Sequence, residues 1–252
     1  MLEILFENDV ILAVNKPSGL LTQAPRGIES LESLVKSYLA GKSNCGGQDN
    51  ENNERNDDEN KNNGVVGIYL GIPHRLDRPV SGVILFGKTS RATRRISEQF
   101  ENRQIDKTYW GIVEGNVDNN EGTWIDYIRK IPNRPIAEIV QPINPDAREA
   151  ILHYKVLRKF IFADNPFTLL EIKLETGRMH QIRLQSSARG HSILGDATYG
   201  STFPFGENFN DERCREIALH ARSISFIDPI SRELINLSAP TPPLWNMLEI
   251  NF

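Results

Sequence analysis

Short patterns of hydrophobic and polar residues predict strands and helices that follow one another along the chain. The run VILAVNKPSG predicts a buried strand over Val10–Val14 that ends in a turn at Pro17–Gly19. Apolar residues then recur at helical spacing over Ser30–Ala40, where Ser30 can cap the helix and Gly41 can end it. The N-terminal part therefore predicts a strand followed by a helix.

The middle of the chain continues in the same way. GVILFGK predicts a strand, a helix with arginines on one face begins at about Ser90, and YWGIVEG predicts another strand. In FTLLEIKL, Leu170 and Ile172 alternate with charged residues as in a half-exposed strand, and a helix is expected from His180 to Ala188. Because there is no regular βαβ rhythm and no glycine-rich phosphate motif, the pattern favours an α+β fold over a dinucleotide-binding fold.

The segment Gly41–Gly64 differs from the rest of the chain, with eight asparagines and almost no apolar residues. Such a segment cannot offset its ordering entropy by burial. We therefore expect a flexible insertion at 41–64 within a single domain that spans 1–252. Its deletion should leave activity nearly unchanged.

Composition narrows the class of protein. The net charge of −4 would argue against a nucleic-acid partner, but the segment 41–64 carries six acidic and three basic residues, whereas His74–Tyr109 carries eight basic and four acidic ones. A basic surface is therefore expected outside the insertion. Two cysteines cannot form a disulfide framework, and neither a membrane span nor a signal peptide is apparent, so a cytoplasmic protein without a membrane partner is expected.

The densest group of reactive side chains is HRLDRPVSG. Asp77 lies between Arg75 and Arg78, and Pro79 holds Arg78 in an extended conformation. Neighbouring guanidinium groups are expected to lower the pKa of the Asp77 carboxyl, which suits it to nucleophilic attack or base catalysis. An ordinary ion pair that fixes a loop fits the same spacing.

A second basic group follows the half-exposed strand. It combines three arginines with polar residues at a turn and the start of a helix: Arg178, His180, Gln181, Arg183, Arg189 and His191. A helix start beside guanidinium groups can bind a phosphate or a carboxylate, although a solvated basic helix face has the same composition.

In KTYWGIVEG, Tyr109 and Trp110 point to opposite faces of a strand, so one can pack in the core while the other faces a cleft and stacks on a base. Packing alone also explains a tyrosine there. No HxxxH, HExxH, CxxC or GxSxG pattern occurs, so neither a metal site nor an acyl-transfer triad is expected.

The motifs HRLDRPVSGVILFGKT, KTYWGIVEG and TGRMHQIR…GHSILGDATYG, in this order, resemble the main motifs of the RluA-type pseudouridine synthases. ILAVNKPSGLLTQ and ALHARSISFIDPISRELINLSAP resemble that family's first and C-terminal strands. The resemblance covers nearly the whole chain outside the Asn-rich segment. It implies the pseudouridine synthase fold, in which helices flank a mixed, largely antiparallel sheet with an active-site cleft.

The resemblance implies that the chain isomerises uridine to pseudouridine in rRNA or tRNA, and no cofactor or metal is expected. Asp77 matches the catalytic aspartate, Tyr109 the tyrosine that packs against the flipped base, and Arg183 an arginine that pairs with the aspartate. Arg75 matches the arginine that fills the place of the extruded nucleotide. Further substrate or RNA contacts are expected from His74, Arg78, Arg178, His180 and Gln181.

The chain departs from the family pattern at Val80, Gln185 and Ser192, where many members carry Thr, His and Pro. These departures, with the acidic net charge, keep open a catalytically silent RNA-binding module. A glycosylase that uses the same base-flipping logic is a further alternative. The oligomeric state cannot be predicted.

Overall fold

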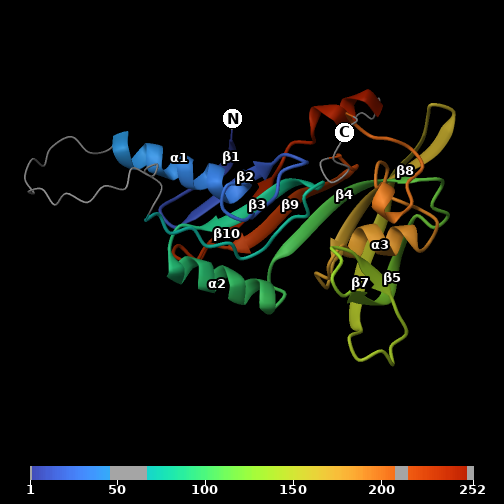
Figure 1. Ribbon diagram of the computed structural model, residues 1–252, viewed down its shortest axis with the longest axis horizontal. Coiled ribbons are helices and arrows are strands. Elements are labelled where there is room, and N and C mark those ends of the chain that lie inside the picture. Colours follow the sequence, from blue (N-terminus) through green and yellow to red (C-terminus); the bar gives the residue numbers. More distant parts are fainter. Residues whose placement is uncertain (1, 46–66, 208–214, 249–252) are drawn as a thin grey trace, which may run out of the picture.

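The computed structural model describes residues 2–45, 67–207 and 215–248, and its strands form one mixed sheet (Figure 1). The strand order is β1 (Glu3–Glu7), β2 (Ile11–Lys16), β3 (Ser81–Gly87), β9 (Leu219–Ile227), β4 (Asp106–Glu114), β8 (Asn165–Leu174), β7 (Arg148–Phe162), β5 (Glu121–Lys130) and β6 (Ala137–Ile139), and β10 (Leu234–Ser238) also pairs with β9. Within the described residues, β3 and β9 are parallel and the other pairs are antiparallel. The α+β prediction is confirmed.

The helices follow the predicted order but differ at their ends. Helix α1 spans Leu31–Cys45, α2 spans Ser90–Glu101 and α3 spans Gln181–Ser187. Short 3₁₀ helices lie at Ala197–Tyr199 and Pro243–Leu248. The start of α2 is confirmed, and the Thr89 hydroxyl caps it by accepting a hydrogen bond from the Ala92 N–H at 3.2 Å.

The predicted end of α1 at Gly41 is wrong, because the helix continues to Cys45. Glycine costs only about 1 kcal/mol in a helix interior, and side-chain contacts outweigh that cost here. The Lys42 ammonium and the Tyr38 hydroxyl both donate to Glu7, at 2.7 and 2.8 Å, and so attach the last turns to β1. The rest of the expected insertion, 46–64, lies outside the described residues.

Helix α3 is shorter than the predicted range His180–Ala188. His180 has a φ of 53°, in the left-handed region, so it cannot form part of the right-handed helix. At the other end the chain leaves the helix through a turn to Gly190, whose φ of 77° suits a glycine.

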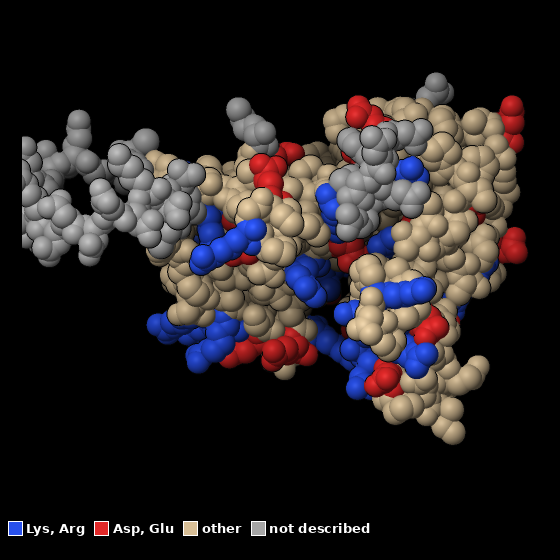
Figure 2. All heavy atoms as spheres, in the orientation of Figure 1, with Lys and Arg blue, Asp and Glu red and all other residues tan. Residues whose placement is uncertain are grey.

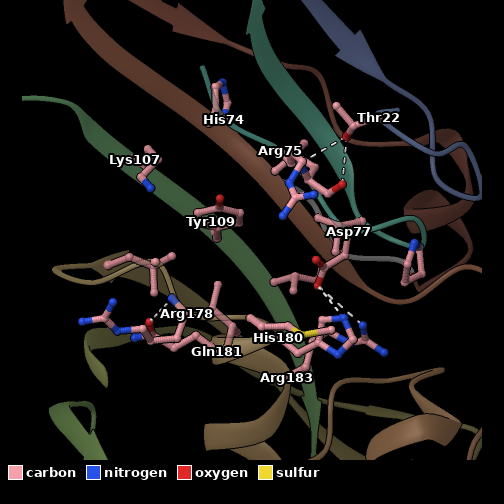
Figure 3. Close-up of a pocket in the computed structure, with 18 of the residues that line it drawn as sticks. Thr22, His74, Arg75, Asp77, Lys107, Tyr109, Arg178, His180, Gln181 and Arg183 are labelled. Carbon is pink, nitrogen blue, oxygen red and sulfur yellow. Dashed lines mark hydrogen bonds and ion pairs between the residues drawn. The ribbon is translucent and has the colours of Figure 1, made fainter. Parts of the chain in front are cut away.

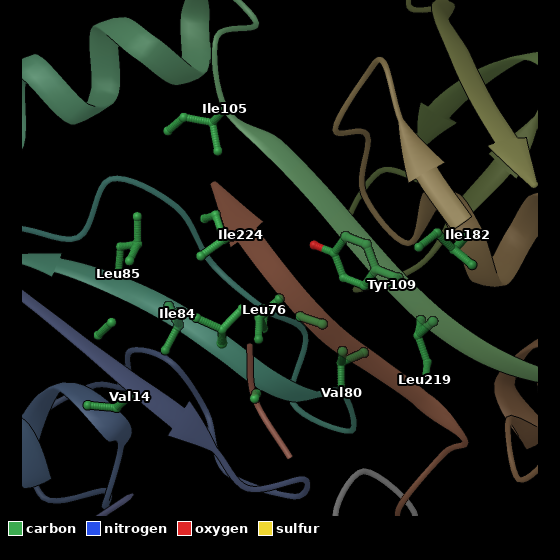
Figure 4. Packing of buried hydrophobic residues seen from close by; sticks show 14 of the residues in the cluster. Val14, Leu76, Val80, Ile84, Leu85, Ile105, Tyr109, Ile182, Leu219 and Ile224 are labelled. Atoms are coloured by element: carbon green, nitrogen blue, oxygen red, sulfur yellow. The ribbon is translucent and has the colours of Figure 1, made fainter. Parts of the chain in front are cut away.

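The sheet joins two halves of the molecule (Figure 1). Strands β1–β3 and β10 lie in one half with α1 and α2, strands β5–β7 lie in the other with α3, and β4 and β9 run between them. The main apolar cluster fills the first half and reaches across β4 and β9; Figure 4 shows Ile84, Leu85, Ile224, Leu219 and Tyr109 within it. A smaller cluster of Ile128, Ala137 and Ala150 packs near α3. None of the helices in the described ranges is long and apolar enough to cross a membrane.

Candidate active site

A cleft of about 1490 Å³ separates the two halves, and basic side chains line its rim (Figure 2). Its walls come from the loop before β3, the end of α2, strand β4 and the turn that leads into α3. All the residues predicted for catalysis or substrate binding line this cleft: His74, Arg75, Asp77, Arg78, Tyr109, Arg178, His180, Gln181 and Arg183. The fold thus brings the three sequence motifs together.

Asp77 lies in a tight turn, in which the Val80 N–H donates to the Asp77 carbonyl at 3.1 Å. Residues at the end of β2 and just after it hold the backbone on both sides of Asp77. The Thr22 hydroxyl donates to the Leu76 carbonyl at 2.9 Å and accepts from the Leu76 N–H at 3.3 Å. The Lys16 ammonium donates to the Arg78 carbonyl at 3.1 Å. The backbone on either side of Asp77 is therefore held at defined points.

The same loop is attached to the sheet at both ends. At its start, His74 Nε2 accepts from the Leu85 N–H at 2.9 Å while the ring packs against Phe100. Burial lowers the pKa of His74 to about 3, so the ring is the neutral acceptor that this bond requires. At its end, Ser81 Oγ lies 2.8 Å from Nδ1 of His220 on β9.

The Asp77 carboxylate faces two residues of the opposite wall (Figure 3). Its Oδ2 lies 3.5 Å from Arg183 Nη1 and 3.7 Å from His180 Nε2. The Asp77 side chain is 35% exposed while that of Arg183 is 5% exposed, so the carboxylate is open to the cleft and its partner is not. Burial lowers the pKa of His180 despite the nearby Asp77 charge, which leaves Arg183 as the main positive partner.

Arg183 is itself fixed by Asp196. Its Nε and Nη2 donate to the two carboxylate oxygens at 2.6 and 2.8 Å, and its guanidinium lies over the Tyr199 ring at 5.0 Å. Burial alone would lower the pKa of Arg183, but the hydrogen bonds and charge of Asp196, together with the charge of Asp77, raise it. Arg183 therefore keeps its charge inside the protein and presents it to Asp77.

Tyr109 lies on β4 at the base of the cleft and is buried apart from 8% of its surface. Burial, together with the negative charge of Asp77, raises the pKa of its hydroxyl, so the phenol stays neutral. Trp110 points to the opposite face of the strand, where the Arg222 guanidinium lies 4.7 Å from its ring. The two rings thus lie on opposite faces of β4, as expected, but Tyr109 alone is both part of the main core cluster and a wall of the cleft.

Other predicted site residues hold the walls of the cleft. Arg78 donates from Nε to the Gly19 carbonyl at 2.9 Å, and Arg178 donates from Nε to the Glu149 carbonyl at 2.8 Å. The Gln181 side chain is buried, and its Oε1 accepts from the Arg178 N–H at 2.9 Å. Arg75 is exposed and projects into the cleft from the Asp77 loop.

The second basic group predicted from the sequence does not form one anion site. Arg189 pairs with Asp126 at 2.8 Å and lies over Trp124, outside the cleft. Gln185, which departs from the family pattern, is buried and donates to Asp126 Oδ2 at 2.7 Å, so it links α3 to β5.

Four residues of this site have no role assigned by the sequence: Lys16, Thr22, Asp196 and Tyr199. Tyr199 holds His180, since its hydroxyl lies 2.8 Å from His180 Nδ1. All four lie in segments that carry the family resemblance, but nothing in their spacing shows which partner each one meets. Among the described residues, no group of three or more His, Cys, Asp or Glu side chains is placed to hold a metal ion.

Comparison with known proteins extends these observations. A family profile described as RNA pseudouridylate synthase matches residues 10–188. The chain is 30% identical to an uncharacterized RNA pseudouridine synthase of Synechocystis, over 96% of this chain and 66% of the relative. It is also 30% identical to tRNA pseudouridine synthase C of Haemophilus influenzae, over 100% of this chain and 98% of the relative. Ribosomal large subunit pseudouridine synthase D of Zymomonas mobilis is 32% identical over 99% of this chain and 74% of the relative.

Two solved structures share the fold. Human RNA pseudouridylate synthase domain containing 1 has a TM-score of 0.71 and 20% identity, over 98% of this chain and 86% of that chain. Human RNA pseudouridylate synthase domain containing 4 has a TM-score of 0.71 and 20% identity, over 99% of this chain and 94% of that chain. The predicted fold, a mixed and largely antiparallel sheet flanked by helices, is thereby confirmed.

Proposed function

The chain belongs to the RNA pseudouridylate synthase family, and from that membership we propose that it isomerises uridine to pseudouridine in RNA with Asp77 as its catalytic carboxylate. The observation that carries the proposal is the position of Asp77, open to the cleft and 3.5 Å from the buried Arg183. The names of the relatives support tRNA and ribosomal RNA as the substrate classes.

The chemistry of the reaction agrees with this site. The N1–C1′ bond breaks, the uracil turns, and C5 bonds to C1′, so no atom is gained or lost. The step needs a negative group beside the sugar and base. Asp77 supplies it, because its carboxylate is open to the cleft and lies 3.5 Å from the buried Arg183 guanidinium. Asp77 acts either by removing the C2′ proton or by direct covalent attack.

The cleft also suits base flipping. A uridine inside a helix is inaccessible, and extruding it costs a few kcal/mol. The Tyr109 ring at the base of the cleft provides a face for the flipped uracil, and its neutral hydroxyl adds no charge that would repel Asp77. The exposed Arg75 projects from the same loop as Asp77 and can fill the vacated position in the RNA.

Mapping of pseudouridine in RNA incubated with the protein tests this proposal. Unmodified tRNA and large-subunit rRNA transcripts should acquire pseudouridine with the wild-type protein and none with Asp77→Asn. Asp164→Asn is the matched control, because Asp164 is an exposed turn residue outside the cleft and its variant should behave as wild type.

Other outcomes reject the proposal in recognisable ways. Release of free uracil indicates a glycosylase, whereas isomerisation leaves the mass of the RNA unchanged. Binding of RNA without pseudouridine in any transcript indicates a silent binding module. Product that persists in Asp77→Asn removes Asp77 from the mechanism.

A further inference from the structure

Arginines gather at the end of α2 that lies away from the cleft. Arg91, Arg94 and Arg95 lie in the first half of α2, and Arg232 lies in the turn between β9 and β10. A second cavity of about 320 Å³ is lined by Arg91, Arg95 and Arg232 together with Thr89, Pro229 and Ile230. In Figure 2 basic side chains cover the corresponding lower left of the molecule. We call Arg91, Arg95 and Arg232 the arginine patch.

The patch brings three arginine side chains to the wall of one small cavity. Burial and then the charges of Arg91, Arg232 and Arg94 lower the pKa of Arg95, so these guanidinium groups repel one another. Two acids lie nearby, and neither lines the cavity: Glu98 lies 3.5 Å from Arg94, and Asp228 is buried in the β9–β10 turn. Arg95 donates to the Pro229 carbonyl, which holds its side chain against the β9–β10 turn.

The backbone of Arg232 is itself in an unfavourable conformation. Its φ of 65° lies in the left-handed region, where a glycine or asparagine is favoured over an arginine. The turn is imposed by Asp228, which is 1% exposed and accepts from the Ile230 and Ser231 N–H groups at 2.7 and 2.9 Å. An arginine in a strained conformation beside other arginines points to a function for its charge.

We propose that the arginine patch binds phosphates of the substrate RNA at a second site outside the catalytic cleft; this inference rests on the proposed function. Helix α2 connects the two places, since its last residues, Phe100 and Glu101, line the cleft. At a rise of 1.5 Å per residue, Arg95 and Arg91 lie about 9 and 15 Å along the helix axis from Glu101, so an RNA whose flipped uridine enters the cleft can also reach the patch. Guanidinium groups pair with phosphate oxygens in two parallel hydrogen bonds, which suits a clustered arginine site.

The test measures RNA binding as a function of salt concentration. Arg91→Gln/Arg95→Gln/Arg232→Gln should reduce the slope of log K against log[salt] by about 2 to 3 units for unfractionated tRNA, because each lost phosphate contact removes about 0.9 unit. The matched control is Lys155→Gln/Arg158→Gln/Lys159→Gln, which removes three exposed charges of β7 that line neither cavity. A decrease in the patch variant no larger than in this control overturns the inference.

The variant Arg232→Gly distinguishes an effect on RNA binding from an effect on protein stability. It relieves the left-handed strain, so the protein should unfold at a higher temperature while it binds tRNA severalfold more weakly. If the triple variant fails to fold, Arg91→Gln/Arg232→Gln retains Arg95 and its bond to Pro229 and should still lower the slope by about 1 to 2 units. A higher unfolding temperature with unchanged RNA affinity would show that Arg232 has no role in binding.

The two proposals fail in different ways. Asp77→Asn should lose pseudouridine formation and keep the wild-type salt slope. The patch variants should form pseudouridine with a raised KM and an unchanged kcat, since they touch neither Asp77 nor its partners. Pseudouridine formation by wild type, combined with an unchanged slope in the patch variants, would leave the proposed function intact and reject the second site.

Discussion

The guanidinium of Arg183 is held by Asp196 through two parallel hydrogen bonds, at 2.6 Å from Nε and 2.8 Å from Nη2. Both side chains are buried, and the arrangement leaves Nη1 for Asp77 at 3.5 Å. Asp196 therefore sets the position of the positive charge that Asp77 meets. It is a positioning residue, since it acts on the catalytic carboxylate only through Arg183.

Asp196→Asn should reduce kcat about 100-fold, because an asparagine cannot hold both guanidinium nitrogens and a small displacement of Arg183 changes its contact with Asp77. The free energy of unfolding should fall by about 3 kcal/mol, since a buried charge loses its partner. Single-turnover pseudouridine formation and urea unfolding measure the two effects. Asp126→Asn is the control: it breaks the Arg189 pair outside the cleft and should leave kcat within twofold of wild type.

Thr22 should matter for catalysis because its hydroxyl holds the backbone of Leu76, the residue before Asp77. Thr22→Val leaves the buried N–H and carbonyl of Leu76 unpaired, at a cost of about 1–3 kcal/mol, and loosens the residue next to Asp77. We expect kcat to fall about tenfold with little change in KM. Thr22→Ser keeps the hydroxyl and should restore kcat. Equal kcat values in the valine and serine variants would assign Thr22 to stability alone.

The parts of the fold that could be predicted are those with strong local patterns. Strand β3 is buried along its whole length, and its apolar run is plain in the sequence. Strand β7 was not predicted. Its alternation of Ala150, Leu152 and Tyr154 is interrupted by a register shift between Val156 and Arg158, beyond which most of its residues are exposed.

The site was predicted from the order of its motifs rather than from local spacing. The motifs identify the segments that carry Asp77 and Arg183, but a pattern of residues cannot show which carboxylate holds which arginine. Asp77 and Asp196 both face Arg183, and only the folded chain separates the exposed carboxylate from the buried one. The left-handed conformation of His180, which aims its ring at Asp77, has no sequence signal either.

Gly82 should not tolerate a side chain. Its φ is +115°, and a Cβ there would lie 2.3 Å from the carbonyl oxygen of Ala221 on β9. Gly82→Ala should therefore lower the free energy of unfolding by more than about 2 kcal/mol, because the parallel β3–β9 pairing must move apart. Gly41→Ala is the contrasting variant: its Cβ meets nothing within 4 Å inside α1, and it should stabilise the protein by about 0.5–1 kcal/mol. Urea unfolding checks both, and a Gly82→Ala protein as stable as wild type would contradict the close approach.

Acid should destabilise the protein through His74. The pKa of His74 is about 3 in the folded protein against 6.5 for an unperturbed histidine, so between these values the unfolded chain binds the additional proton. The free energy of unfolding therefore rises with pH from about 3 to 6.5 and is lost as pH falls through this window. At pH 4.5, two pH units below the unperturbed pKa of histidine, the loss is about 2–3 kcal/mol.

His74→Gln isolates this contribution to acid stability. The glutamine amide oxygen can still accept from the Leu85 N–H, but it does not titrate. The loss of unfolding free energy between pH 7.5 and 4.5 should then shrink by about 2–3 kcal/mol relative to wild type, while the two proteins differ little at pH 7.5. His220, whose pKa is lowered to about 4 mainly by burial, remains in both proteins and accounts for part of the remaining acid sensitivity. Urea unfolding at the two pH values measures the difference, and equal pH dependence in both proteins would show that His74 is not the buried neutral acceptor of the Asp77 loop.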